Sequence, residues 1–133
     1  MLRLSPLTGE YPLPNILVIE DIPESAELAA QILRRHGHTV RIAGTGKLGL
    51  EMALTEKPDL IVYDYWLPDL DARTFLTRLR SNAGFEKVPV LACTASPTAA
   101  MDPVVGQQGF SGMIHKPYRV TNFMETIDAQ LAG

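Results

Sequence analysis

The sequence predicts an α/β fold: a doubly wound, five-stranded parallel sheet with strand order 2-1-3-4-5 and about five helices. Short apolar runs recur five times, and they alternate with segments whose apolar residues have helical spacing. The runs are apolar throughout, as expected for strands that helices cover on both faces. Right-handed crossovers leave few ways to wind such a sheet. The length of 133 residues suits one domain.

The first predicted elements follow a stretch rich in proline and turn formers. We predict that residues 1–14 form an N-terminal arm and that residues 15–133 form the domain. NILVIED (15–21) is a continuous apolar run that ends in acids, which indicates a strand. The segment 23–37 begins at a proline, has acids early and arginines late, and ends at a glycine, which indicates a helix.

The same alternation continues through the middle of the chain. HTVRIA (38–43) is predicted as the second strand, and TGKLGLEMALTEK (45–57) as the second helix. PDLIVYD (58–64) is the third strand. It is followed by the helix DARTFLTRLRSN (71–82), which Asp71 can cap.

The last third of the chain supplies two more strands and the closing helix. VPVLACTA (88–95) and FSGMIHK (110–116) are the apolar runs, and RVTNFMETIDAQLA (119–132) has helical spacing. The segment 96–109 is where a fourth helix is expected.

Composition excludes several classes of function. The net charge of −3 offers no basic surface for nucleic acid. No apolar run approaches the roughly 20 residues that span a bilayer, and the start of the chain lacks the apolar middle of a secretory signal. We therefore expect a cytoplasmic protein that binds neither membrane nor nucleic acid. The single cysteine, Cys93, lies in an apolar run and is predicted to be a small core residue.

Three acids mark one edge of the predicted sheet. Glu20 and Asp21 end the first strand, and Asp64 ends the third. In the order 2-1-3-4-5 these strands are neighbours where the winding reverses, which is where open α/β sheets place their ligands. Carboxylates that converge repel one another, and a hard cation such as Mg²⁺ relieves the repulsion. The alternative is that each acid only begins a loop or caps a helix.

Two further polar residues are expected at the same edge. Thr94 follows the fourth strand, and Lys116 follows the fifth. A carboxylate beside a metal, a hydroxyl donor and an ammonium together suit transfer of a phosphoryl group to the carboxylate of Asp64.

The ordered motifs ILVIED, DYWLPDLD, CTA and HKP resemble the receiver domains of response regulators in two-component signalling. The resemblance extends from about Asn15 to Leu131 and implies a flavodoxin-like, single-domain protein.

The resemblance also implies a set of site residues. Asp64 would accept a phosphoryl group from a histidine kinase or histidine phosphotransfer protein. Asp21 and Asp64 would bind Mg²⁺ directly, with the backbone carbonyl of Trp66, and Glu20 would act mainly through water. Output would pass by contact with a downstream protein or a second copy of the chain. The protein would not be an enzyme on a diffusing substrate.

Activation in the family depends on a threonine, a lysine and an aromatic residue. The resemblance implies that Thr94 moves toward the phosphoryl oxygen and that Lys116 pairs with it. Met113 stands where the family usually has an aromatic residue whose rotamer follows the threonine. A methionine fills a vacated pocket but lacks the phenol hydroxyl, so we expect the usual aromatic switch to be missing.

Three other positions depart from the family pattern. Glu20 replaces the more usual aspartate but should still serve in the outer shell. Ala72 replaces a usual glycine, so a positive φ there would be strained. Pro103 falls where a helix interior is normal, and Asp102-Pro103 indicates instead an N-cap and first turn of a short, late helix. We hypothesise that output is read differently from this face.

Trp66 has two interpretations. The family uses this position to tune loss of the phosphoryl group, so the indole could screen Asp64 from water and slow hydrolysis. Alternatively, an exposed indole serves a partner surface.

A competing motif lies in AGTGKLG. Gly44, Gly46 and Gly49 form G-x-G-x-x-G after a predicted strand, and Asp64 follows at the distance of a ribose-binding acid. However, the motif follows the second strand instead of opening the fold. We expect these glycines to let a helix pack closely on the sheet. A phosphate loop is excluded because Lys47 is followed by leucine.

The histidines are predicted to be structural. His36 and His38 flank a helix end, where a cation suits the helix dipole. His115 should point away from its neighbour Lys116 and lie at the surface. Two functions therefore remain: a phosphoryl-accepting switch, and a receiver-like interaction module that works without phosphorylation.

Overall fold

The sheet has five parallel strands in the order β2-β1-β3-β4-β5. The computed structural model describes residues 13–95 and 110–132. Within these ranges the elements are β1 (Asn15–Ile19), α1 (Pro23–Arg35), β2 (Thr39–Ala43), α2 (Gly46–Thr55), β3 (Leu60–Asp64), α3 (Ala72–Arg80), β4 (Val90–Thr94), β5 (Gly112–His115) and α5 (Val120–Ala132). The predicted α/β fold and strand order are confirmed.

Two predictions fall outside the described residues. The segment expected to hold the fourth helix, with Asp102 and Pro103, is not among them, so four of the about five predicted helices are described. Most of the predicted arm, residues 1–14, also lies outside them, and its extent stays a prediction.

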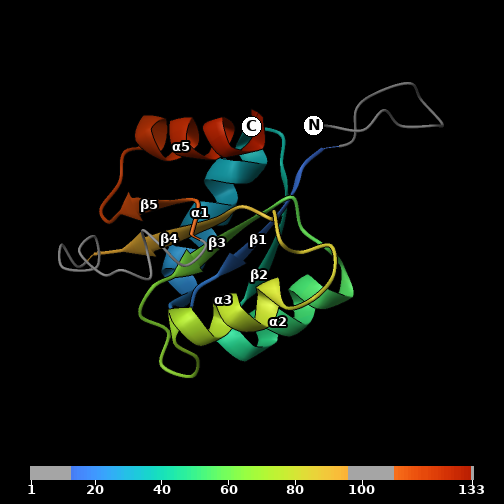
Figure 1. The fold of residues 1–133 in the computed structure, drawn as a ribbon. Coiled ribbons are helices and arrows are strands. Elements are labelled where there is room, and N and C mark those ends of the chain that lie inside the picture. The colour runs from blue at the N-terminus through green and yellow to red at the C-terminus, as the bar shows by residue number, and fades with distance from the viewer. Residues whose placement is uncertain (1–12, 96–109, 133) are drawn as a thin grey trace.

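Helices cover both faces of the sheet, as Figure 1 shows: α1 and α5 lie on one face, and α2 and α3 on the other. The strands divide their side chains accordingly. In β1, Ile16 and Val18 join the cluster that contains residues of α1 and α5, whereas Leu17 and Ile19 join the cluster that contains residues of α2 and α3. This alternation with a period of two explains why the run is apolar throughout.

Helix ends explain where the loops begin. Asp71 caps α3, as predicted, by accepting a hydrogen bond from the Thr74 amide at 2.8 Å. Ala72 is the first residue of α3, and no residue other than glycine has a positive φ in the described ranges. The strain expected at Ala72 is therefore not found, because that residue already has helical backbone. Across the described residues, the helices are too short or too polar to cross a membrane.

Candidate functional site

Polar side chains gather at the carboxyl ends of the central strands. Glu20 follows β1, Asp64 ends β3 and Thr94 ends β4. These three are buried, with exposures of 6%, 8% and 1%, and in the described part of the chain they are the buried polar or charged residues. Burying such groups is costly unless they find partners. The parallel topology brings them together because all strands end at the same edge.

The acids form a group that could hold a metal ion. Glu20, Asp21 and Asp64 each offer a carboxylate oxygen, and these oxygens lie within 4.8 Å of one another. Burial, and then the charge of Glu20, raise the pKa of Asp64 from its ordinary 3.8 to about 6. Lys116 opposes this shift without cancelling it. Three oxygen donors with excess negative charge are the ligand chemistry of a hard divalent cation.

Lys116 is held in the site by two contacts. Its Nζ donates to Glu20 Oε2 at 2.8 Å, and its backbone amide donates to the Thr94 carbonyl at 2.8 Å. Burial tends to lower the pKa of the ammonium, but the hydrogen bond to Glu20 and nearby negative charge leave that pKa above its usual value. The lysine is therefore a fixed positive charge. The ion pair spans 96 positions of the sequence, and the sequence interpretation did not include it.

Thr94 lies beside the end of β3. Asp64 pairs with Cys93 in the sheet register, and the Tyr65 amide donates to the Cys93 carbonyl at 3.0 Å. Thr94 is therefore one residue beyond the partner of Asp64. This register places its hydroxyl at the same sheet edge as the acids.

The loop after Asp64 begins with a contact to that side chain. The Trp66 amide donates to Asp64 Oδ1 at 3.3 Å. Trp66 is 58% exposed, and its indole meets the Tyr65 ring edge to face with 4.7 Å between the ring centroids. Such exposure leaves the ring accessible to a partner. Its suggested role in slowing hydrolysis stays a prediction.

Met113 packs inside the domain. It is half-buried in β5 and contacts the cluster on the α2 and α3 side of the sheet. The thioether therefore occupies core space on that side, and whether it responds to Thr94 stays a prediction.

The glycine motif has a packing role. A Cβ added to Gly49 would lie 2.5 Å from Ile19 Cδ1, so the glycine lets α2 approach β1. At the start of α2, the amides of Gly46 and Lys47 donate to Asp69 Oδ1 and Oδ2, each at 2.9 Å. A pyrophosphate would need these amides. The carboxylate of Asp69 already takes them, which removes the basis for a dinucleotide site.

The histidines and the cysteine are predicted to be structural. His36 is the C-cap residue of α1, and its Nδ1 lies 2.8 Å from the Ile32 carbonyl. Burial lowers the pKa of His38. Cys93 is buried, and burial raises the pKa of its thiol to about 12, so it behaves as the core residue that was predicted. His115 is exposed, as predicted.

Comparison with known proteins assigns the fold to one family. The sequence matches the response regulator receiver domain family over residues 16–128. It is 32% identical over 120 residues to protein PilH of Pseudomonas aeruginosa, with 90% of this chain and 98% of PilH covered. It is 33% identical over 119 residues to the probable transcriptional regulatory protein TcrX of Mycobacterium tuberculosis, where 88% of this chain spans only 49% of the relative.

A solved structure gives the same result for the fold. The receiver domain of sensor histidine kinase PA1611 from Pseudomonas aeruginosa, which has a magnesium ion in its active site cleft, matches with a TM-score of 0.83. The match covers 92% of this chain and all of that domain, at 22% identity.

Proposed function

Since the chain belongs to the response regulator receiver domain family, we propose that it is a phosphoryl-accepting switch of a two-component or phosphorelay system. Asp64 is the acceptor, and the donor is a histidine kinase or a histidine phosphotransfer protein. The observation that carries this proposal is the cluster of Glu20, Asp21 and Asp64 within 4.8 Å, with the ammonium of Lys116 2.8 Å from Glu20.

Mg²⁺ fits the oxygen donors of this cluster. Asp21, Asp64 and the backbone carbonyl of Trp66 would hold the ion directly, and Glu20 would act through water. Bound there, Mg²⁺ would offset negative charge on the phosphoryl oxygens. The magnesium ion in the PA1611 receiver domain supports this assignment.

Asp64 acts as the nucleophile. One of its carboxylate oxygens forms a bond to phosphorus while the bond from phosphorus to the donor's imidazole nitrogen breaks, and the imidazole leaves with the electron pair and takes up a proton. A pKa of about 6 leaves Asp64 ionised at pH 7 to 8. Lys116 neutralises charge on the transferred group, and the Thr94 hydroxyl donates a hydrogen bond to it. The protein thus promotes its own phosphorylation instead of turning over a diffusing substrate.

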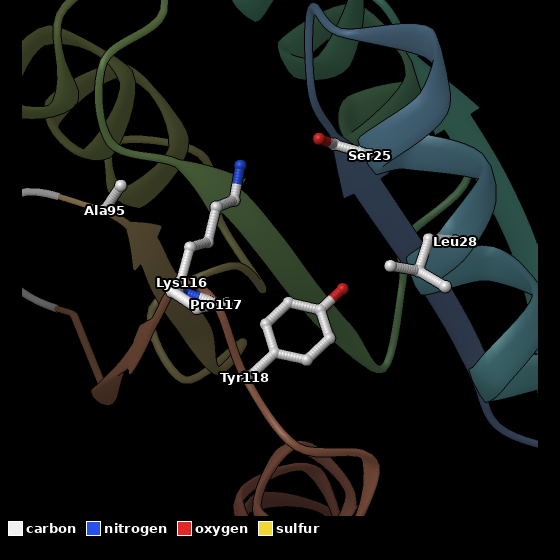
Figure 2. A pocket seen from close by; sticks show the side chains of 6 residues that line it. All are labelled: Ser25, Leu28, Ala95, Lys116, Pro117 and Tyr118. Atoms are coloured by element: carbon white, nitrogen blue, oxygen red, sulfur yellow. The ribbon is translucent and has the colours of Figure 1, made fainter.

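We assign the docking place of the donor to a groove beside Lys116. Its volume is about 360 Å³, and its lining is mostly apolar. Figure 2 shows Ser25 and Leu28 of α1 on one side, and Lys116, Pro117 and Tyr118 on the other. Because Lys116 belongs to both the groove and the acidic site, the occupant is the protein that brings the phosphohistidine to Asp64.

Intact-mass analysis after incubation with acetyl phosphate tests the proposed function. With Mg²⁺ present, the unchanged protein should gain the mass of one phosphoryl group, and it should gain none in excess chelator. Asp64→Asn should gain none under either condition. Asp59→Asn, which changes an exposed acid before β3, is the matched control and should behave as the unchanged protein.

The opposite result has a defined meaning. If the folded, unchanged protein gains no mass, the proposed switch is wrong and the phosphorylation-independent interaction module is favoured. Met113 and Pro103 would then be the positions at which to seek its mechanism.

A further inference from the structure

The loop between β3 and α3 is fastened to a helix far from it in sequence. Asp69, in the middle of this loop, accepts hydrogen bonds from the Gly46 and Lys47 amides with both carboxylate oxygens, at 2.9 Å each. Thr45 Oγ1 accepts the next amide, that of Leu48, at 3.0 Å. The first three amides of α2 are thus satisfied, two of them by a residue of another loop.

Residues on both sides of the contact between Asp69 and the start of α2 are suited to it. A Cβ on Gly46 would lie 2.9 Å from Leu70 Cβ and 3.3 Å from Asp69 Oδ1, so a glycine is required for the loop to come this close. Although burial tends to raise it, the hydrogen bonds from the Gly46 and Lys47 amides leave the pKa of Asp69 below its usual value. The cap is therefore a charged one at neutral pH.

A second anchor holds the same part of the loop to the sheet. The buried hydroxyl of Tyr63 donates to the Leu70 carbonyl at 2.7 Å. Tyr63 immediately precedes Asp64 in β3. Residues 69 and 70 are therefore fixed relative both to α2 and to the strand that carries the proposed phosphoacceptor.

These anchors leave little freedom to the segment between them. At its start, the Tyr65 amide is bonded to the Cys93 carbonyl at 3.0 Å. Between Tyr65 and Asp69 stand only Trp66, Leu67 and Pro68. Leu67 is buried and Pro68 has a restricted φ. The orientation of the Trp66 carbonyl thus depends on where both ends of this short segment are held.

We propose that Asp69 is a positioning residue for the metal site: by capping α2, it fixes the loop that presents the Trp66 carbonyl beside Glu20, Asp21 and Asp64. This inference rests on the proposed function. Residues that orient metal ligands without touching the metal commonly change metal affinity by 10- to 100-fold when removed.

Asp71 supplies a matched comparison within the same loop. It also accepts two hydrogen bonds at a helix start, from the Thr74 amide at 2.8 Å and from Thr74 Oγ1 at 2.9 Å. It carries the same charge as Asp69, but these contacts are to its own helix. If Mg²⁺ binding depends only on a helix cap or on nearby negative charge, replacement of either aspartate should weaken it. If it depends on the position of the loop, only replacement of Asp69 should weaken it.

The test is the Mg²⁺ dissociation constant of the unchanged protein, Asp69→Ala, Asp69→Asn and Asp71→Ala. Trp66, the one tryptophan in the sequence, serves as a fluorescent reporter, and titration calorimetry is the second readout. We expect the Mg²⁺ dissociation constant of Asp71→Ala to lie within about twofold of that of the unchanged protein. That of Asp69→Ala should be about tenfold higher. Asp69→Asn, which keeps one acceptor oxygen, should lie between them.

A kinetic measurement separates positioning from general damage. With acetyl phosphate as donor, Asp69→Ala should need a higher Mg²⁺ concentration for half-maximal phosphorylation but should approach the normal maximal rate when Mg²⁺ is saturating. Circular dichroism and urea titrations would establish that each variant is folded.

The outcomes distinguish this inference from the proposed function. If the unchanged protein binds Mg²⁺ but Asp69→Ala and Asp71→Ala bind it equally well, the positioning role is overturned and the proposed function stands. If the unchanged protein binds no Mg²⁺, the metal-dependent switch itself is overturned, and the positioning role falls with it.

Discussion

Charged side chains lie both where the strands begin, at the amino edge of the sheet, and where they end, at the carboxyl edge. The two groups differ in burial. At the carboxyl edge, Glu20 and Asp64 are buried, and their group of three acids has one ammonium, that of Lys116, within reach of Glu20. The result is an excess of negative charge in which two of the three acids are buried and Asp21 is exposed.

The amino edge holds a more exposed cluster of two acids and one arginine. Asp59 accepts from the Asn15 amide at 2.7 Å, and Glu56 lies 3.4 Å from Arg41. Arg41 also donates to the backbone carbonyls of Met52 and Glu56, at 3.2 and 2.8 Å, at the end of α2. These hydrogen bonds join β2 to the end of α2. Because Glu56 is exposed, its ion pair with Arg41 contributes little to stability.

The comparison teaches that acids alone do not mark a functional site. Both edges have carboxylates close to main-chain donors, but only at the carboxyl edge does burial act together with like charge, and it raises the pKa of Asp64 to about 6. A carboxyl group buried beside other acids, at a cost in stability, is a candidate functional group.

The largest expected effect is the pH dependence of stability in the absence of metal. The pKa of Asp64 rises from 3.8 in the unfolded chain to about 6 in the folded protein, so the folded state binds its proton more tightly. The contribution of Asp64 to the free energy of unfolding should therefore fall as the pH rises from about 3 to about 7, by up to about 3 kcal/mol. Urea titrations in excess chelator measure this change.

Asp64→Asn isolates that effect. It should match the unchanged protein at pH 4 and be more stable at pH 7, because the amide cannot ionise. Asp59→Asn at the other edge should have the opposite sign, a loss of about 1 kcal/mol, because the amide is a weaker acceptor for Asn15. Equal responses in the two variants would show that the edges do not differ.

A smaller effect on stability is expected from Gly49, which packs against Ile19 at the carboxyl end of β1. Gly49→Ala should lower the free energy of unfolding by about 1–3 kcal/mol, because the new methyl group would overlap with Ile19. Gly44→Ala, where nothing lies within 4 Å of the added atom, is the control and should change stability by less than about 0.5 kcal/mol. Urea titration is again the measurement, and an unchanged stability in Gly49→Ala would refute the packing role.

The smallest effect is expected at the amino edge. Arg41→Gln should lower the free energy of unfolding by about 1 kcal/mol, through loss of hydrogen bonds to the carbonyls at the end of α2. It should leave the Mg²⁺ dissociation constant unchanged. Arg41→Lys keeps the positive charge but lacks the planar guanidinium group that donates both of these hydrogen bonds. A change of Mg²⁺ affinity in either variant would show that the two edges are coupled.

The order of apolar runs and helical segments was sufficient to predict the parallel sheet, its strand order and the gathering of Glu20, Asp64 and Thr94 at one edge. The physical reason is that the apolar pattern that marks each element is local, and the handedness of parallel crossovers leaves few strand orders. Continuous apolar runs require a sheet covered on both faces, and parallel strands must end on the same side.

Contacts between distant residues needed the folded chain. The ion pair of Lys116 with Glu20, and the cap that Asp69 places on α2, depend on how far a side chain reaches across a packed interface. Gly49 shows the same limit: its place in G-x-G-x-x-G suggests a nucleotide, and only its distance from Ile19 shows that it serves packing. Spacing along a chain determines which face a residue occupies, but three-dimensional packing determines what it meets there.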